Sequence, residues 1–212
     1  MFFHYVIMNN LVMNKQYEYV HMKYKKNENS KTTPLLQKYY DLVISQEFLL
    51  KKNYKNVLQI PKILKIAINI SSKVIINDRK YIIPALIALE LITGQKIKFT
   101  LTKKSISAFK CRKNQLIGCS VSLKGYLMYT FLEKMVRILL SRSRNYSGLY
   151  LKNFDSKGNY TFGIKNLLLF SELENHFEFF EYIKGVDITI VTSAKNKEEA
   201  ALLFSCLQLP II

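Results

Sequence analysis

A cluster of cations without acidic neighbours is the part of this sequence best equipped for chemistry. The stretch Lys103–Gly125 contains no Asp or Glu, and residues 91–154 hold thirteen Lys and Arg residues against a single acid, Glu133. Like charge at this density is self-repelling unless a polyanion compensates it. An ordinary solvated surface mixes both signs and explains the stretch poorly. The chemistry indicated is binding of phosphate groups by Lys103, Lys104, Lys110, Arg112, Lys113 and Lys124.

Catalysis finds little support in the same residues. With one carboxylate and no histidine, residues 91–154 lack the usual groups for general acid–base chemistry. The chain has neither a Walker-type phosphate loop nor a Gly-x-Gly-x-x-Gly motif. Its three histidines and three cysteines do not have metal-ligand spacing. We therefore expect no catalytic residue, no metal and no cofactor.

The composition is that of a folded, strongly basic protein. The chain has 212 residues, of which 49% are hydrophobic, and a net charge of +17. It is long enough to bury a core, and its field attracts nucleic acids or anionic membrane surfaces. No apolar run reaches the roughly 20 residues of a membrane span. The most amphipathic helix expected, at residues 126–142, has an apolar stripe as wide as a domain core needs, which disfavours a membrane-surface role.

Two stretches of alternating apolar and polar residues flank the cationic segment, so their structure determines where the cations lie. Residues 96–102 and 117–123 place an apolar side chain at every second position, which predicts two strands with one face on the core. Phe99 and Leu101 belong to that expected core face. The intervening residues 103–116 then form a long hairpin loop, and loops of that length are commonly functional.

The remaining pattern predicts the rest of the sheet and its helices. A strand at residues 62–70 should turn Leu64 toward the core and Lys65 and Asn69 away from it. In the helix at 126–142, Lys134 is expected to face outward. The fold class predicted is α+β, a mostly antiparallel sheet with helices packed on one face and a long basic hairpin loop. Asn196 has capping-box spacing to Glu199 and predicts the start of the last helix. The other elements expected are helices at 34–54 and 77–93, an extended segment at 158–164 and a strand at 186–192.

Cations and short polar side chains interleave on the polar face of the expected sheet. Such a mixture suits phosphate and 2′-hydroxyl contacts and predicts recognition of a folded RNA by its shape. Phe109, inside the cationic loop, is placed either to stack on an exposed base or to tuck into the core. The residues of this predicted RNA face are Lys65, Asn69, Thr93, Gln95, Lys96, Lys98, Ser105 and Gln115.

From Gln59 onward the chain resembles the bacterial and organellar type of large-subunit ribosomal protein five. The resemblance rests on strings in the family's order, among them "QIPKILKIAINI", "GQKIKFT", "KKSISAFKCRKNQLIGCSVSLKG", "FDSKGNYTFGIK" and "GVDITIVTSA". It implies a structural, non-catalytic protein of the central protuberance that binds 5S rRNA and adjacent large-subunit rRNA. It also implies contacts with P-site tRNA and with neighbouring ribosomal proteins, including one in the head of the small subunit.

The resemblance assigns roles to residues by motif. The rRNA-facing set it implies includes Gln59, Asn69, Thr93, Gln95 and Lys96, with Lys103 and Lys104 near the RNA backbone. The loop from Ser105 to Ile117 is expected to face tRNA, through Phe109, Lys110, Arg112, Lys113 and Gln115. Residues 171–182 depart from the family, and within them Leu173–Tyr182 is unusually aromatic and acidic. Residues 1–33 have no counterpart in it and are expected to form an extension, disordered or docked on a partner, ahead of one domain at 34–212.

Two other functions and three locations stay open. A stand-alone RNA chaperone or RNA-binding module would use the same basic sheet, and an RNA-modifying enzyme ranks third. Only five of the 32 basic residues are Arg, and Asn, Ile, Tyr and Phe are abundant, as in translation from an AT-rich genome. We therefore expect an organelle-encoded protein of a mitochondrial ribosome. The alternatives are a plastid and the cytoplasm of an AT-rich bacterium.

Overall fold

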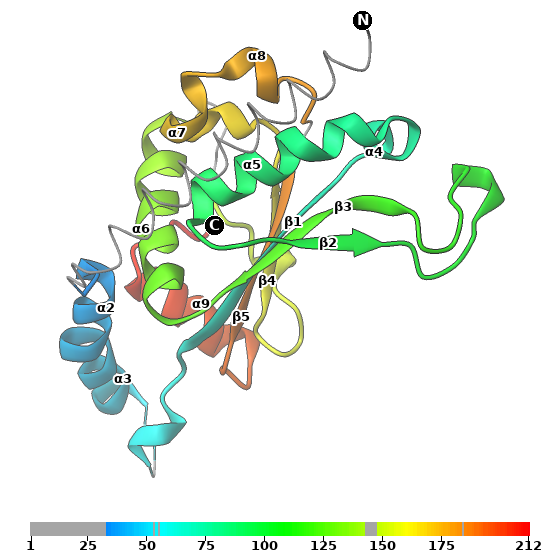
Figure 1. Cartoon of the computed structure of the whole chain (residues 1–212). Helices are drawn as coiled ribbons and strands as arrows, with labels where there is room; N and C mark the ends of the chain where they lie inside the picture. Colours follow the sequence, from blue (N-terminus) through cyan, green and yellow to red (C-terminus); the bar gives the residue numbers. More distant parts are fainter. Residues whose placement is uncertain (1–32, 53, 55, 143–147, 184) are drawn as a thin grey trace, which may run out of the picture. The chain divides into compact units, whose positions relative to one another are not determined.

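One antiparallel sheet of five strands organises the fold (Figure 1). The computed structural model describes residues 33–52, 54, 56–142, 148–183 and 185–212. The strands lie in the order β2-β3-β1-β5-β4, so the long strand β1 is central and β2 and β4 are the edges. The predicted extension at residues 1–33 lies, except for Thr33, outside the described residues. The strands are β1 (Ile63–Ser71), β2 (Lys98–Leu101), β3 (Leu116–Leu123), β4 (Tyr160–Ile164) and β5 (Val186–Thr192).

The two faces of the sheet differ in chemistry, as the alternating sequence predicts. Ile66 pairs with Leu123 on one side and with Ile190 on the other, and Ile190 pairs with Tyr160. All four side chains are buried. Because successive residues of a strand point to opposite faces, this row and its neighbours form the core face. The α+β class with an antiparallel sheet is confirmed.

Helices cover the core face. α5 contacts β3, α6 contacts β1, and the Phe204 ring of α9 lies 5.6 Å from the Tyr160 ring of β4. The first helix begins at Leu35, with Pro34 as its N-cap, one residue later than predicted. α3 ends at Lys51, before the expected Tyr54, because Lys52 is extended. The helices are α2 (Leu35–Tyr39), α3 (Ser45–Lys51), α4 (Lys73–Asn77), α5 (Ile82–Thr93), α6 (Gly125–Arg142), α7 (Ser171–Glu174), α8 (Phe177–Phe180) and α9 (Lys197–Cys206), with a π-helical turn, Tyr40–Ile44, joining α2 to α3.

Several helix boundaries differ from the sequence prediction. Asn77 does not cap the helix that ends at Thr93; it ends α4, which Ser72 caps by accepting a hydrogen bond from the Val74 N–H. At α9 the capping box is incomplete. Asn196 makes no side-chain cap, and the Glu199 carboxylate accepts from the Lys195 N–H. None of the helices in the described ranges is long and apolar enough to cross a membrane.

Three apolar residues of the strands are exposed, contrary to the alternation. The register of β1 against β5 shifts between Ile63 and Lys65, so Ile63 is buried and Leu64 is exposed. Phe99 pairs with the buried Cys119 and so lies on the core side of the sheet, yet it is 53% exposed. Leu101, which follows a register shift against β3, is also 53% exposed. β2 is an edge strand, and the helices that cover the core face make few contacts with it.

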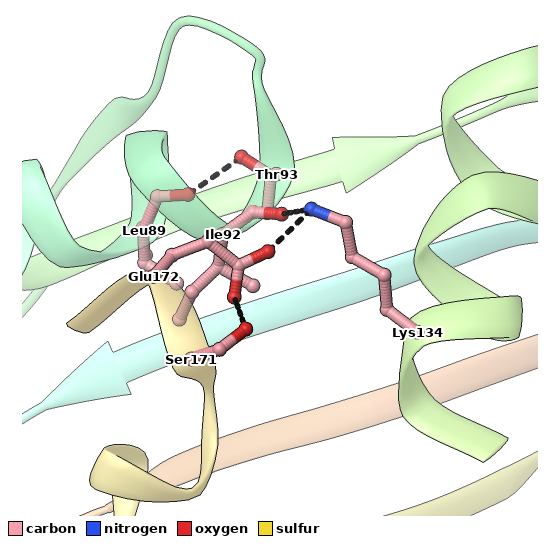
Figure 2. A network of polar contacts seen from close by, with 6 residues as sticks. All are labelled: Leu89, Ile92, Thr93, Lys134, Ser171 and Glu172. Atoms are coloured by element: carbon pink, nitrogen blue, oxygen red, sulfur yellow. Dashed lines mark hydrogen bonds and ion pairs between the residues drawn. The ribbon is translucent and has the colours of Figure 1, made fainter. Parts of the chain in front are cut away.

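Lys134 is not an outward-facing surface residue. Its ammonium lies between α6, α5 and α7, 2.7 Å from Glu172 Oε1 and 3.5 Å from the carbonyl oxygen of Ile92 (Figure 2). Ser171 donates to the other oxygen of Glu172. Burial by itself raises the pKa of Glu172, but hydrogen bonds from Lys134, the backbone and Ser171, with the Lys134 charge, lower it overall. This ion pair fastens α7 to the rest of the helical layer.

Candidate nucleic-acid interface

The face of the sheet opposite the helices carries a polar row that crosses all five strands. Lys98 pairs with Ser120, Ser120 with Asn69, Asn69 with Asp187, and Asp187 with Gly163. A parallel row contains Ser122, Ala67, Thr189 and Thr161. Small polar side chains leave the sheet backbone open to close approach by a ligand. This surface, the open face, can offer hydrogen bonds along its whole width.

Charge divides the open face into two halves. Lys65 of β1 and Lys98 of β2 are exposed on it, whereas β5 contributes Asp187, which is also exposed. A polyanion is attracted to the β2-β3-β1 half and repelled near Asp187. The predicted residues Lys65, Asn69 and Lys98 all fall in the basic half.

The turn after α5 contains three of the predicted RNA contacts in different environments. Thr93 is buried, and its hydroxyl donates a 2.7 Å hydrogen bond to the Leu89 carbonyl (Figure 2). Gly94 follows in the left-handed conformation (φ 66°) and ends the helix. Gln95 is half-buried and Lys96 exposed. The Thr93 hydroxyl proton is engaged within the protein, and an RNA contact by this residue stays a prediction.

Gln59 lies apart from these strands, in the short turn before β1. It ends a single 3-10 turn, Val57–Gln59, and its side chain is exposed. Ile60 and Pro61, which follow, are buried, and the Pro61 carbonyl accepts a 3.0 Å hydrogen bond from the Tyr40 hydroxyl. This bond fixes the turn to the π-helical turn between α2 and α3 and leaves Gln59 exposed to solvent.

Thr102 and Gln115 close the base of the loop between β2 and β3. The Thr102 N–H donates to the Gln115 carbonyl at 2.9 Å, and the Gln115 N–H donates to Thr102 Oγ1 at 2.9 Å. The Thr102 hydroxyl also donates to the Arg112 carbonyl. The Gln115 amide accepts from the Arg112 N–H and donates to the Ile76 carbonyl, each at 3.0 Å. Gln115 therefore has a clear structural role, independent of any contact with tRNA.

Beyond that base the loop projects from the end of the sheet (Figure 1). Ile106 and Cys111 exchange two backbone hydrogen bonds around the turn Ser107–Phe109, and Lys110 adopts a left-handed conformation (φ 54°). Phe109 is 62% exposed, so the alternative that it tucks into the core is wrong. Ser105 Oγ accepts from the Lys113 N–H at 3.0 Å. The exposed polar residues of the loop are Lys103, Lys104, Ser105, Ser107, Lys110, Arg112, Lys113 and Asn114.

The cations of the loop lack intramolecular counter-ions. Within the described part of the chain, none of them forms an ion pair with a carboxylate. Glu133, the one acid in residues 91–154, is engaged elsewhere: its Oε1 accepts a 2.6 Å hydrogen bond from the Leu36 N–H. The positive field of the loop is therefore available to an external anion.

Other chemistry is weakly represented in the structure. No group of three or more His, Cys, Asp or Glu among the described residues could hold a metal ion. Cys119 is buried, and desolvation raises the pKa of its thiol to about 11, so the reactive thiolate is scarce at neutral pH.

Sequence reasoning overlooked four residues of the open face: Ser120, Ser122, Thr161 and Thr189. Each occupies a position of its strand that faces away from the core. Thr161 lies in residues 158–164, which the sequence predicted only as an extended segment. The signal was present at 117–123 and 186–192, but only the strand pairing shows that these residues lie beside Asn69 and Ala67.

Comparison with known proteins gives consistent matches along this part of the chain. Residues 56–112 match the family model described as ribosomal protein L5, and residues 116–211 match the model for the C-terminus of the same family. The large ribosomal subunit protein uL5m of Reclinomonas americana is 43% identical over 176 residues, covering 83% of this chain and 97% of its own. The uL5m of Prototheca wickerhamii is 40% identical, covering 82% of each chain. The uL5 of Mycoplasma pneumoniae is 40% identical, covering 84% of this chain and 97% of its own.

Proposed function

This chain belongs to the ribosomal protein L5 family, and from that premise we propose that it binds 5S rRNA and the adjacent rRNA of the large ribosomal subunit. The family is structural and non-enzymatic, and its members are proteins of the large subunit. In this proposal the protein holds RNA in the central protuberance of the subunit.

The observation that carries the proposal is the row Lys98, Ser120 and Asn69 across the basic half of the open face. Short polar side chains and exposed lysines on a sheet surface can contact phosphates and 2′-hydroxyls of a folded RNA. Lys65, Gln95 and Lys96 would extend that contact, with Gln59 at the turn before β1. Lys103 and Lys104 would bind the RNA backbone.

The loop is assigned a second RNA partner. Its tip presents Phe109, Lys110, Arg112 and Lys113, all exposed, beyond a closed base. An exposed ring among cations can stack on an unpaired base while the cations bind phosphates. We assign the loop to P-site tRNA, and another surface of the protein to a bridge with the small-subunit head.

An RNA-binding titration tests the central claim. The full chain should bind 5S rRNA with an affinity that falls steeply as salt rises, because contacts between lysines and phosphates release counter-ions. Asn69→Ala should weaken binding by ~1–3 kcal/mol if its RNA partner is left buried and unpaired. Thr161→Ala, at the far edge of the same face, is the matched control and should have little effect.

The outcome also separates the proposal from its alternative. A binding constant insensitive to salt would contradict a phosphate-dominated interface. Equal affinity for 5S rRNA and for an unrelated RNA of the same length would favour a general RNA chaperone.

We place the protein in a ribosome of organellar or bacterial type, like its relatives, and its excess of Lys over Arg supports an organelle-encoded origin.

A further inference from the structure

Strongly exposed apolar side chains gather on α2 and α3, the first two helices that the structure describes. Leu35 is 72% exposed, Leu42 66% and Leu50 87%. Val43, which follows Leu42 in the π-helical turn between the two helices, is also exposed. Single exposed apolar residues are common on soluble proteins, but a group of them on one element marks an interaction site. We call Leu35, Tyr39, Leu42, Val43, Gln46 and Leu50 the α2–α3 face.

The opposite side of these helices belongs to the core. Tyr40, Ile44 and Phe48 are buried, and the Tyr40 ring lies 6.5 Å from the Tyr129 ring of α6. α2 contacts α6 directly (Figure 1). A helix that is apolar on both sides is usually buried on both sides. The α2–α3 face is therefore carried by a packed element, yet among the described residues nothing covers it.

The apolar residues of the α2–α3 face are arranged nearly symmetrically along the helices. Leu35 and Leu50 lie at its two ends, and Leu42 and Val43 lie next to each other at its centre. When a second copy lies antiparallel, Leu35 of each copy meets Leu50 of the other, and the two central pairs meet at the two-fold axis. A surface that matches its own reverse is what a two-fold dimer requires.

The polar residues of the same segment match under this reversal. Lys38 and Glu47 are equally far from the centre and carry opposite charges, so each end of an antiparallel pair brings a cation near a carboxylate. Glu47 binds Lys51 through Oε2, at 3.2 Å, and its Oε1 can accept from a second cation. Tyr39 and Gln46, also equally far from the centre, can each donate and accept hydrogen bonds. A parallel pair would instead bring like charges together.

We propose that the α2–α3 face binds a second copy of this chain, antiparallel to the first, about a two-fold axis at Leu42 and Val43. Removal of the apolar side chains from water on both copies drives the association. One helical segment from each copy is a small interface compared with the roughly 800 Å² per partner of a stable complex. We therefore expect a dissociation constant of ~10–100 µM for the free protein.

The proposal goes beyond RNA binding and does not rest on it. α6, against which these helices pack, contacts β1 from the core side of the sheet. The open face and the loop between β2 and β3 therefore stay accessible in the dimer, and each copy can bind its own RNA.

Sedimentation of the full chain, freed of RNA, tests this inference at protein concentrations from about 1 µM to about 1 mM. Two copies of net charge +17 repel each other at long range. Salt screens that repulsion, so the association should strengthen as salt rises. Copies held together by contaminating RNA would instead separate, because contacts between lysines and phosphates weaken with salt.

A substitution at the centre of the α2–α3 face should prevent the association. Leu42→Glu removes a central apolar contact and places like charges at the two-fold axis, so we expect binding at least about tenfold weaker. Phe109→Glu, at the tip of the loop, is the matched control, because Phe109 is 62% exposed and the substitution changes the net charge equally. It should change the affinity less than about twofold. Should Leu42→Glu fail to fold, as its melting curve would reveal, Leu50→Glu replaces it and should weaken binding similarly.

Cysteine substitutions test the antiparallel arrangement, with oxidised glutathione as the oxidant. Leu42→Cys lies close to its counterpart across the axis and should form a disulfide between copies. Leu35→Cys lies on the order of 20 Å from its counterpart and should form none alone, yet it should cross-link to Leu50→Cys when the two variants are mixed. The native chain, with Cys111 and Cys119 buried and Cys206 half-buried, measures the background cross-linking.

Four results would overturn the inference. The first is a native chain that stays monomeric throughout; if Leu42→Glu then lowers its stability, the α2–α3 face is covered from within the same chain. The second is dissociation of the copies by salt. The third is an equal loss of association in Leu42→Glu and Phe109→Glu. The fourth is cross-linking of Leu35→Cys alone as readily as of Leu42→Cys, which would exclude an antiparallel pair.

Discussion

The Leu36 N–H donates a 2.6 Å hydrogen bond to Glu133 Oε1, joining residues 97 apart in sequence. α2 begins after Pro34, which has no side-chain group to cap it. A carboxylate from α6 therefore supplies the cap that the local sequence lacks, and negative charge at a helix N-terminus is favourable. The single acid of the basic segment stabilises a helix and leaves the loop cations unneutralised.

Removing that cap should lower stability while leaving the interface intact. We expect Glu133→Ala to reduce the free energy of unfolding by ~1 kcal/mol, and Glu133→Gln by less, because an amide oxygen can still accept the hydrogen bond. Urea unfolding measures both. Affinity for 5S rRNA should not fall in either variant; a fall in affinity at unchanged stability would show that Glu133 acts at the interface.

Stability should depend on pH through Glu172. Its pKa is lowered in the folded protein from its ordinary value of 4.5. A carboxyl group with a lowered folded pKa contributes stability that is complete above the unfolded value and is lost as pH falls through the folded value. The unfolding free energy should therefore decline below about pH 4.5, and Glu172→Gln should flatten that decline. Glu178→Gln, at an exposed position, is the control; an identical decline in both variants would exclude Glu172 as the source.

Gly118 should tolerate no side chain. A Cβ atom there would lie 2.0 Å from the Ile70 carbonyl oxygen, on the neighbouring strand. Gly118→Ala must therefore displace β3 from β1, and we expect a loss of about 3 kcal/mol in unfolding free energy. Gly163→Ala is the control, because its Cβ would meet the exposed Asp187 carboxylate at 3.3 Å and the Val186 carbonyl oxygen at an ordinary 3.8 Å. Calorimetric melting of both variants measures the difference, and equal melting temperatures would contradict the close approach.

The tip and base of the loop should respond differently to mutation. Phe109→Ala removes an exposed ring and should change the unfolding free energy by less than about 0.5 kcal/mol. Large subunits that carry it should hold P-site tRNA less firmly. Gln115→Ala breaks the bonds to Arg112 and Ile76 and should expose residues 102–115 to proteolysis. Normal tRNA retention by the Phe109→Ala subunits, with the protein shown to be present, would remove the ring from the tRNA contact.

The sequence predicted which face of each strand points to the core better than it predicted which parts of that face are covered by helices. Alternation located β1, β3 and β5, because period two follows from backbone geometry alone. It also assigned Phe99 and Leu101 to the core side of β2, which the pairing of Phe99 with the buried Cys119 confirms for Phe99. Whether a helix lies over that side depends on tertiary packing, which no local pattern encodes, and both residues are in fact exposed.

Functional positions showed the same division. Composition predicted the cationic loop, and alternation placed Asn69 on the polar face of the sheet, as its pairing with Ser120 shows; their contacts with RNA stay predictions. The burial of Thr93 and the role of Gln115 at the loop base depend on partners at Leu89 and Ile76, and the latter is 39 residues away. The helical pattern of α6 predicts that Lys134 faces solvent, yet its ammonium donates hydrogen bonds to the Glu172 carboxylate and the Ile92 carbonyl. Long-range polar contacts of this kind leave no periodic trace in the sequence.

The central position of β1 has a consequence for how quickly the protein can fold. β1 pairs with β3 and also with β5, and the Lys62 N–H beside it bonds to Ser193, 131 residues later. Sheets dominated by such distant pairings fold slowly, since the entropy of closing a long loop is lost before the contacts form. During synthesis β1 can pair with β3 early, but its other edge has no partner until β5 has been made. That open edge is a site for mispairing with other chains, so we expect refolding yield to fall with protein concentration.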